Sequence, residues 1–540
     1  MIPRRICLIL YLLSLFLVGV GYLALLPPFE GTDERAHFSS MRQIAATATV
    51  PVLGKSTLDL AYEGYEGPKP YSVVTRPFNS GLVYSKFFAQ PDLVKNYKRH
   101  YRDAPTTSTF IPGEQINWQA QHPPLYYLAM APIVNAVNGL SFVTQLFVLR
   151  LASFVLAFGG VVFGLLAVEK GLNGKQQDAA FMGFFLYPLI FPIFLQDFAR
   201  LGNDSLCLFF VGLLTYLLVL WRRDETNTKL AVSIGIVLGL GLLTKALFMP
   251  VFVVLTVFLF LRLWFDKRGA EAQPLRRVAL IGVFYPALLM GGAWYLGRLA
   301  LNGDLSGGID SIWLAQNGGW IAGLREHFSI YALTRSILAT IFSYSWAGTS
   351  SYAFLPLSLR TPLVVLLFWV FGAFILQIKK KRADDFAWLP VWLFAFLAAG
   401  LFYHLMIGLA TDGMGHTLGL YLHILKPCVA PAVGVGVTAI MKKPRARRVM
   451  IAALIYAFLF QLAAVWSQFS LFTGCATKPD DEYYAFPSSS FCLDQAATLV
   501  DRMGVIGWPT LAAVGFGGGV LCTAALVLYK TGGFEGAKRR

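Results

Sequence analysis

Charged residues are scarce in this 540-residue sequence, where Asp, Glu, Lys and Arg together make up 14% of the chain. Hydrophobic residues make up 56% and aromatic residues 15%, and the mean hydropathy is +0.60. A soluble domain cannot bury so large an apolar fraction, so the composition excludes that class. Stretches of strand-length alternation are also lacking, which argues against a β-barrel. The sequence therefore predicts an all-α polytopic membrane protein.

Further absences narrow the function classes. The sequence has no phosphate-cradling glycine loop in a suitable context, so no nucleotide-handling domain is expected. Acidic residues are few, 29 against 45 basic residues, which gives a net charge of +16. More than half of the basic residues lie in clusters between successive pairs of apolar segments, as at Lys379 to Arg382 and Lys442 to Arg448. This distribution follows the positive-inside rule for cytoplasmic loops and points away from a nucleic-acid partner.

Taking the basic clusters as cytoplasmic predicts about twelve transmembrane helices, within a range of about 11 to 13. They form one membrane-embedded domain, residues 1–540, with both termini on the cytoplasmic side of a bacterial inner (plasma) membrane. The first apolar segment lacks a small-residue cleavage pattern, so we expect a retained span rather than a signal peptide. The predicted spans lie near residues 7–26, 149–168, 179–196, 205–221, 230–243, 246–264, 278–300, 362–378, 386–406, 418–440, 449–468 and 508–529.

Long loops then face the extracytoplasmic side, at residues 27–148, 301–361 and 469–507. Within the first loop, segment 122–137 (HPPLYYLAMAPIVNAV) is apolar but short and rich in proline. We expect it to be a re-entrant or interfacial helix rather than a regular span. The last loop holds Cys475 and Cys492, which form either a disulfide or two free thiols in an oxidising compartment.

Polar and ionisable residues gather at the predicted outer ends of the spans, where such groups are costly and are therefore candidate functional residues. Each has a structural interpretation as well: a helix cap for the acids, a hydrogen-bonded surface imidazole for the histidines, and a snorkelling side chain for the lysine. The residues are Asp33, Glu34, His37, His122, Arg200, Asn203, Asp204 and Lys245.

The chemistry of this set suggests group transfer. Of two neighbouring carboxylates, one holds a proton more tightly, and partial burial acts in the same direction. Such a carboxylate can take a proton from a hydroxyl nucleophile as a general base. Lysine and arginine nearby supply fixed positive charge for a departing phosphate. We therefore predict transfer from a phosphate-bearing donor to a hydroxyl acceptor.

Four sequence patterns resemble the GT-C superfamily of integral membrane glycosyltransferases. They are the acidic pair after the first span (GTDERAHF), the QHPPLYYL segment, the ARLGND turn and the LLTKALFMP turn. The first two are similar to the DE-x-x-HF and QHPPLYY patterns of one bacterial group of membrane proteins within it. The resemblance covers roughly the first half of the chain by motif and the rest by span count.

The resemblance implies a GT-C-like fold and an inverting glycosyltransferase. It would use a polyprenyl-phosphate sugar donor and a glycan or lipid acceptor on the extracytoplasmic face, in the synthesis of cell-envelope polysaccharide. It assigns Asp33 or Glu34 as the catalytic base, and Lys245 with Arg200 as the donor-phosphate site. It implies that the acceptor or a metal ion is oriented by Asp204, Asn203, His37 and His122. A divalent cation is an open possibility, with Asp33, Asp204, His37 and His122 as its ligands.

One region departs from the family pattern. Related sequences carry arginine at the outer start of a late span, where this chain has Leu420 in GLYLHILKP. His416 or Lys426 is the candidate replacement for that charge, although Lys426 would lie about two helical turns deeper.

Two other function classes stay open. A transporter or flippase would place charged residues near mid-membrane in paired repeats, and would move lipid or solute without a covalent product. A non-catalytic protein of polysaccharide assembly would tolerate the joint loss of Asp33, Glu34 and Asp204.

Overall fold

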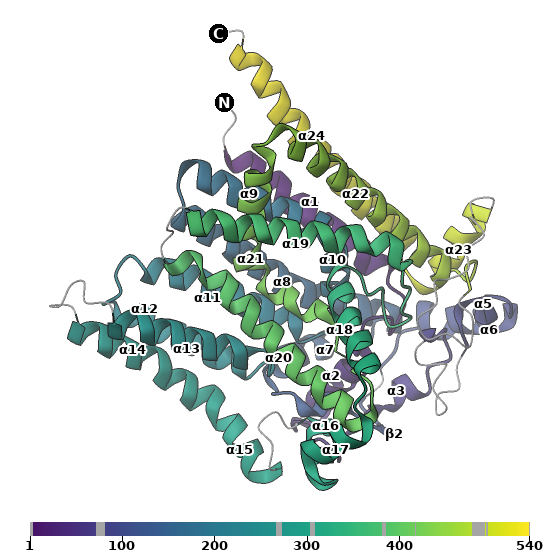
Figure 1. Cartoon of the computed structure of the whole chain (residues 1–540). Helices are drawn as coiled ribbons and strands as arrows, with labels where there is room; N and C mark the ends of the chain where they lie inside the picture. Colours follow the sequence, from purple (N-terminus) through teal and green to yellow (C-terminus); the bar gives the residue numbers. More distant parts are fainter. Residues whose placement is uncertain are drawn as a thin grey trace.

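The computed structural model describes residues 4–71, 82–107, 109–265, 273–302, 308–380, 385–415, 417–477, 492 and 495–538. Helices dominate it, and long apolar helices form a bundle (Figure 1). The bundle helices are α1 (Arg4–Leu25), α8 (Phe142–Gly171), α9 (Gly174–Ile190), α11 (Asp204–Trp221), α12 (Thr228–Leu242), α13 (Phe248–Phe265), α14 (Gln273–Ala287), η4 (Leu288–Gly292), α15 (Ala293–Asn302), α19 (Leu357–Lys380), α20 (Leu389–Asp412), η6 (Gly419–Leu425), α21 (Lys426–Met441), α22 (Pro444–Phe472) and α24 (Pro509–Lys538).

Shorter elements connect the bundle helices and carry much of the candidate site. In the first long loop they are α2 (Glu34–Thr47), β1 (Thr57–Asp59), α3 (Leu60–Glu63), α5 (Tyr84–Phe88), α6 (Pro91–Tyr97), η1 (Lys98–Asp103), β2 (Pro112–Ile116), η2 (Trp118–Gln121) and α7 (Leu125–Val137). The others are α10 (Ile193–Phe198), α16 (Ile309–Gln316), α17 (Gly319–His327), α18 (Ile330–Ser345), η5 (Asp385–Ala387) and α23 (Ala496–Ile506).

Nine helices in the described residues are long and apolar enough to cross a membrane. This confirms the all-α membrane fold, because a spanning helix must satisfy its backbone internally and present apolar side chains to lipid. The other three predicted spans fall on α9, α12 and α13, of 17, 15 and 18 residues. A count of twelve spans therefore stays a prediction.

Glycine pairs let the bundle helices approach closely, as is common in membranes. A Cβ on Gly160 of α8 would lie 2.3 Å from the Leu208 carbonyl oxygen, and one on Gly212 of α11 would lie 2.1 Å from the Gly160 oxygen. No larger side chain fits at either position. The close contact fixes α11, which begins at Asp204, against α8, which carries Arg150.

Helices α1 and α24 run antiparallel, so the start of α1 and the end of α24 lie at the same end of the molecule (Figure 1). The Trp508 amide donates to the Ala24 carbonyl at 2.9 Å, and Ser14 Oγ donates to the Gly519 carbonyl at 2.9 Å. At the other end of the bundle, Cys475 and Cys492 form a disulfide with their Cα atoms 6.2 Å apart. Residues 478–491, 493 and 494 of loop 469–507 lie outside the described residues.

The first long loop packs onto the bundle as a folded layer. Strands β1 and β2 pair antiparallel, with Thr57 opposite Ile116, and lead the chain into η2 and α7. Helix α7 has 13 residues, a length of about 20 Å, which is short of the roughly 30 Å hydrocarbon core. It packs against α2 and α8, and Tyr126 and Tyr127 are buried there. The interfacial or re-entrant role of segment 122–137 stays a prediction.

A buried carboxylate, Glu30, ties the end of α1 to the segment between α18 and α19. Its oxygens accept hydrogen bonds from the hydroxyls of Tyr84, Thr349 and Ser351, and from the Ser351 amide at 3.2 Å. Burial raises the pKa of the Glu30 carboxyl above its ordinary value, and the hydroxyl donors only partly offset this. Glu30 lies three residues before Asp33, so this contact anchors the loop that carries the predicted base.

We predict that Glu30→Ala lowers the free energy of unfolding by about 2 to 4 kcal/mol, since several buried donors lose the acceptor that they share. Thermal unfolding of the purified protein in detergent measures the change. Glu66→Ala, which truncates an exposed carboxylate of the same loop, serves as the control and should stay within about 0.5 kcal/mol of wild type. Equal stability of the two variants would contradict the anchoring role.

Candidate functional site

Asp33 stands at the N-terminus of α2 in a left-handed backbone conformation, with φ 58° and ψ 8°. Its carbonyl accepts from the amides of Ala36 and His37, while its side chain makes no cap hydrogen bond to the helix. The carboxylate points elsewhere: Oδ1 accepts from Trp118 Nε1 at 3.1 Å. Oδ2 accepts no hydrogen bond from the described residues, and the side chain is only partly buried. A left-handed backbone that aims an accessible carboxylate away from the helix is typical of functional sites.

Glu34, its neighbour, has a different environment. It is fully buried, and Arg150 of α8 binds both of its oxygens, with Nε to Oε1 at 2.7 Å and Nη2 to Oε2 at 2.6 Å. The Leu201 amide also donates to Oε1 at 3.1 Å. A carboxylate held by a bidentate guanidinium and a backbone amide is not placed to take a proton from a substrate. The geometry thus favours Asp33 over Glu34 as the base.

The ARLGND turn forms a compact charged network. Arg200 donates to Asp197 Oδ1 at 2.8 Å and to Asp204 Oδ2 at 3.0 Å. Lys245 Nζ donates to Asp204 Oδ1 at 2.7 Å, and its ammonium lies 4.5 Å from the centre of the Tyr421 ring. All four charged groups are more than nine-tenths buried, and their charges balance. Attraction between the paired charges offsets the free-energy cost of burying them away from water.

The turn contacts the Asp33 loop directly. Arg200 Nη1 donates to the carbonyl of Thr32 at 3.1 Å, one residue before Asp33. A Cβ on Gly31 would lie 2.6 Å from Arg200 Cβ, so only glycine allows this approach. The structure therefore brings the acidic loop and the Arg200–Asp204–Lys245 network together in one site. The membrane face on which this site lies stays a prediction.

His37 and His122 lie beside the network. His37 is buried with Nδ1 2.9 Å from the Tyr127 hydroxyl. Burial lowers the pKa of His37 well below its ordinary value, and Arg200 and Lys245 lower it further. For His122, burial and the Lys245 charge lower the pKa to about 3. Both imidazoles are therefore neutral at physiological pH.

Lys245 has more unused N–H donors than Arg200. Arg200 uses Nε, Nη1 and Nη2 in contacts within the site, so it orients Asp197 and Asp204. Lys245 uses one N–H on Asp204, and its other two meet no acceptor among the described residues. Asn203 donates to the Thr244 carbonyl at 3.5 Å and leaves its buried Oδ1 without a partner in the described chain. Lys245 is thus better placed than Arg200 to hold a phosphate.

A metal centre does not fit these residues. No three His, Cys, Asp or Glu side chains within the described ranges form a group able to hold a metal ion. The predicted ligand set of Asp33, Asp204, His37 and His122 is therefore not assembled. Both oxygens of Asp204 are already bound to cations, which would repel a divalent ion.

The late span has no charged residue at the Leu420 position. Leu420 is buried, and His416 lies outside the described residues. Lys426 is fully buried at the start of α21, with Nζ 3.9 Å from the centre of the Phe194 ring and no hydrogen-bond partner in the described chain. The structure shows no contact between Lys426 and the network around Lys245.

Sequence reasoning missed three contributors to the site: Arg150, Trp118 and Asp197. Arg150 interrupts an apolar run (LFVLRLASF), and an arginine inside such a run is itself a signal of a buried partner. Trp118 and Asp197 carry no comparable signal. They reach the site through β2 and η2 and through the short helix α10, whose placement local patterns do not predict.

The family model for predicted membrane proteins called DUF2142 matches residues 16–413. This chain belongs to the DUF2142 family. No curated protein sequence matches the chain.

Solved structures similar to this DUF2142 member include ArnT from Cupriavidus metallidurans bound to undecaprenyl phosphate. The two share 14% identity over 96% of this chain and 76% of that chain, with a TM-score of 0.48. The Archaeoglobus fulgidus oligosaccharyltransferase in complex with zinc and sulfate is also similar, with 13% identity over 80% and 52% of the chains and a TM-score of 0.36.

We predict that Glu34→Ala and Arg150→Ala each lower the free energy of unfolding by about 3 to 5 kcal/mol, since each leaves one buried charge unpaired. The double variant Glu34→Leu/Arg150→Met should lose less than the sum of the two. Thermal unfolding in detergent measures both effects. Glu169→Ala, on the exposed end of α8, is the control. A Glu34 variant that is fully stable but inactive would instead make Glu34 the base.

Proposed function

We propose that this protein is a membrane glycosyltransferase that moves a sugar from a polyprenyl-phosphate donor to a hydroxyl acceptor. One observation carries the proposal: the Arg200–Thr32 hydrogen bond joins an accessible carboxylate, Asp33, to a site where Lys245 has free N–H donors. A base for a hydroxyl and a cation for a phosphate are the two groups that such a transfer requires. The motif resemblance to the GT-C superfamily agrees with this assignment.

In the proposed reaction, the acceptor hydroxyl approaches Asp33 and gives its proton to Oδ2. The acceptor oxygen forms a bond to the anomeric carbon as the bond from that carbon to the phosphate oxygen breaks. The phosphate, still attached to the polyprenyl chain, leaves with the bonding electrons and is held by the Lys245 ammonium. A single carboxylate is available, since Glu34 is paired with Arg150, so direct displacement with inversion is the route that the geometry supports.

The neutral imidazoles suit this role. A protonated His37 or His122 would add positive charge beside Lys245. Because burial keeps both neutral, they can exchange hydrogen bonds with sugar or acceptor hydroxyls without changing the charge of the site. Asn203 Oδ1, buried without a partner in the described chain, is a further acceptor for such a hydroxyl.

We place the site on the extracytoplasmic side of a bacterial plasma membrane, where it would serve cell-envelope polysaccharide synthesis. The basic clusters lie in the opposite loops, and the positive-inside rule makes those loops cytoplasmic. The start of α1 and the end of α24 lie at one end of the bundle (Figure 1), which agrees with an even number of spans between them.

We predict that Asp33→Asn reduces sugar transfer by a factor of about 10² to 10⁴, the usual contribution of a general base. The amide keeps the shape of the side chain and tolerates the left-handed backbone, so thermal unfolding should be unchanged. Mass spectrometry of surface glycans, in cells that carry each variant, measures transfer. Asp92→Asn, an exposed acid of the same loop, is the matched control. Normal glycans in the Asp33 variant would refute the assignment.

We predict that Lys245→Met weakens donor use by about tenfold or more, since one charge-assisted hydrogen bond to phosphate is lost. Lys245→Arg should retain part of the activity because it keeps the charge. Transfer kinetics at varied donor concentration show the effect as a raised KM. Lys229→Met, at an exposed position in the first turn of α12, is the control. An unchanged KM in Lys245→Met would contradict the phosphate role.

A further inference from the structure

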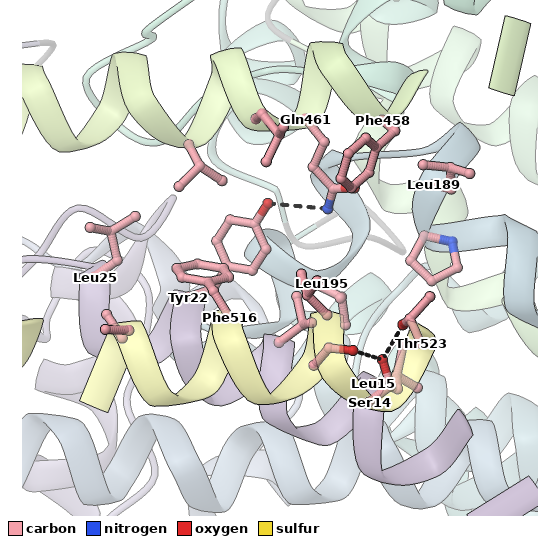
Figure 2. Close-up of a pocket in the computed structure, with 18 of the residues that line it drawn as sticks. Ser14, Leu15, Tyr22, Leu25, Leu189, Leu195, Phe458, Gln461, Phe516 and Thr523 are labelled. Carbon is pink, nitrogen blue, oxygen red and sulfur yellow. Dashed lines mark hydrogen bonds between the residues drawn. The ribbon is translucent and has the colours of Figure 1, made fainter. Parts of the chain in front are cut away.

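A cavity of about 670 Å³ lies between α1, α9, α10, α22, α23 and α24, and we call it the α1–α24 cavity (Figure 2). Its volume falls in the range of small-molecule binding pockets. The Asp33 and Lys245 side chains do not line it, so it is separate from the candidate catalytic site. It belongs to the membrane-spanning part of the protein, because α1, α22 and α24 are candidate spans.

The walls of the cavity suit an apolar chain. Some polar atoms in the lining pair with one another: Ser14 Oγ lies 2.8 Å from Thr523 Oγ1, and Gln461 Nε2 donates to the Tyr22 hydroxyl at 3.4 Å (Figure 2). None of the lining residues has a buried polar atom without a partner. The described lining has no charged side chain to pair with a head group, whereas a hydrocarbon chain loses nothing by entering.

The cavity is also open toward lipid. Leu462 of α22 and Val520 of α24 line it and remain 51% and 53% exposed. Large apolar side chains that stay exposed in a spanning helix face the hydrocarbon core of the membrane. A chain can therefore enter sideways from the bilayer.

The length of the cavity favours a long hydrocarbon chain over an ordinary acyl chain as its occupant. On α1 its lining forms one stripe of residues three or four apart, Tyr11, Leu15, Val18, Tyr22 and Leu25. From Leu25 to Tyr11 the helix rises about 21 Å, whereas one leaflet supplies about half of the roughly 30 Å core. A cavity that continues beyond one leaflet fits a chain longer than an ordinary acyl chain.

Two contacts connect the cavity to the candidate catalytic site. Leu195 of α10 lines the cavity, and Asp197, two residues later, accepts from Arg200. Leu25 of α1 lines the cavity, and the next carbonyl, that of Leu26, accepts from Arg150, which also holds Glu34. One end of the cavity therefore lies beside the elements that hold the acidic loop.

We infer that the α1–α24 cavity binds the polyprenyl chain of the lipid-linked donor while its phosphate occupies the Lys245 site. The inference rests on the proposed function, which supplies a donor of this class. It assigns chain recognition to α1, α22 and α24, elements that take no part in the proposed chemistry. Affinity for the donor should then depend on chain length as well as on the phosphate.

The test is equilibrium binding of three probes to the purified full-length protein in detergent: undecaprenyl phosphate, farnesyl phosphate and phosphatidylglycerol. Ala513→Trp places a large ring in the cavity, because Ala513 lines it and has room to extend. Val514→Trp is the matched control, since the adjacent side chain is 58% exposed and lies outside the lining. Thermal unfolding of both variants checks that they fold alike.

We expect Ala513→Trp to weaken undecaprenyl phosphate binding by about tenfold or more, because the ring displaces several buried methylene groups. Farnesyl phosphate, which offers the same phosphate with a short chain, should bind Ala513→Trp and wild type alike. Val514→Trp should bind all probes as wild type does. Phosphatidylglycerol should not compete with undecaprenyl phosphate.

Several results would overturn the inference. Equal undecaprenyl phosphate affinity in Ala513→Trp and wild type would place the chain elsewhere and leave the proposed function standing. Equal competition by phosphatidylglycerol would make the occupant an ordinary membrane lipid. Failure of wild type to bind undecaprenyl phosphate would reject both proposals. A different pair of results would reject only the phosphate site. In that case farnesyl phosphate would bind Lys245→Met as tightly as wild type, while Ala513→Trp would still weaken the binding of undecaprenyl phosphate.

Discussion

The candidate site depends on two hydrogen bonds between loops that are far apart in sequence. Arg200 donates to the Thr32 carbonyl, and the Leu201 amide donates to Glu34. Because Glu34 also binds Arg150 of α8, three segments are held as one buried unit at the end of the bundle. Without this junction, the carboxylate of Asp33 and the ammonium of Lys245 would belong to separate loops with no common orientation.

The junction also explains why two adjacent carboxylates have different environments. Glu34 is surrounded by donors and holds the fold together, whereas Asp33 has one donor, Trp118, and one oxygen without a partner in the described chain. A buried ion pair adds little net stability, but removing one partner is costly. The Glu34 side chain is therefore fixed by packing and charge, whereas the Asp33 carboxylate can still accept a hydrogen bond or a proton from a substrate.

Part of this arrangement could be predicted from sequence. Apolar runs and basic clusters indicate the membrane fold, and the concentration of charge at predicted outer ends indicates Asp33, Asp204 and Lys245. The different roles of Asp33 and Glu34 could not be predicted. They depend on Arg150, which lies 116 residues from Glu34 in the sequence and binds Glu34 but not Asp33. The expected metal ligand set was not assembled for a similar reason: pairing of Asp204 with Arg200 and Lys245 is a tertiary contact, and spacing alone does not reveal which oxygens are already bound. The α1–α24 cavity left no local signal, since its stripes of apolar residues look like any helix face in a bundle.

The left-handed backbone at Asp33 narrows the range of residues that this position can accept over evolution. Asn, Asp and Gly adopt that conformation readily, whereas longer or β-branched side chains pay a steric penalty. Glutamate, although it carries the same charge, would meet that penalty and project its carboxyl group one bond farther from the backbone. Homologous chains with this loop geometry would thus be restricted to aspartate as an acid here, and a change to asparagine or glycine would mark lineages that have lost the reaction but kept the scaffold.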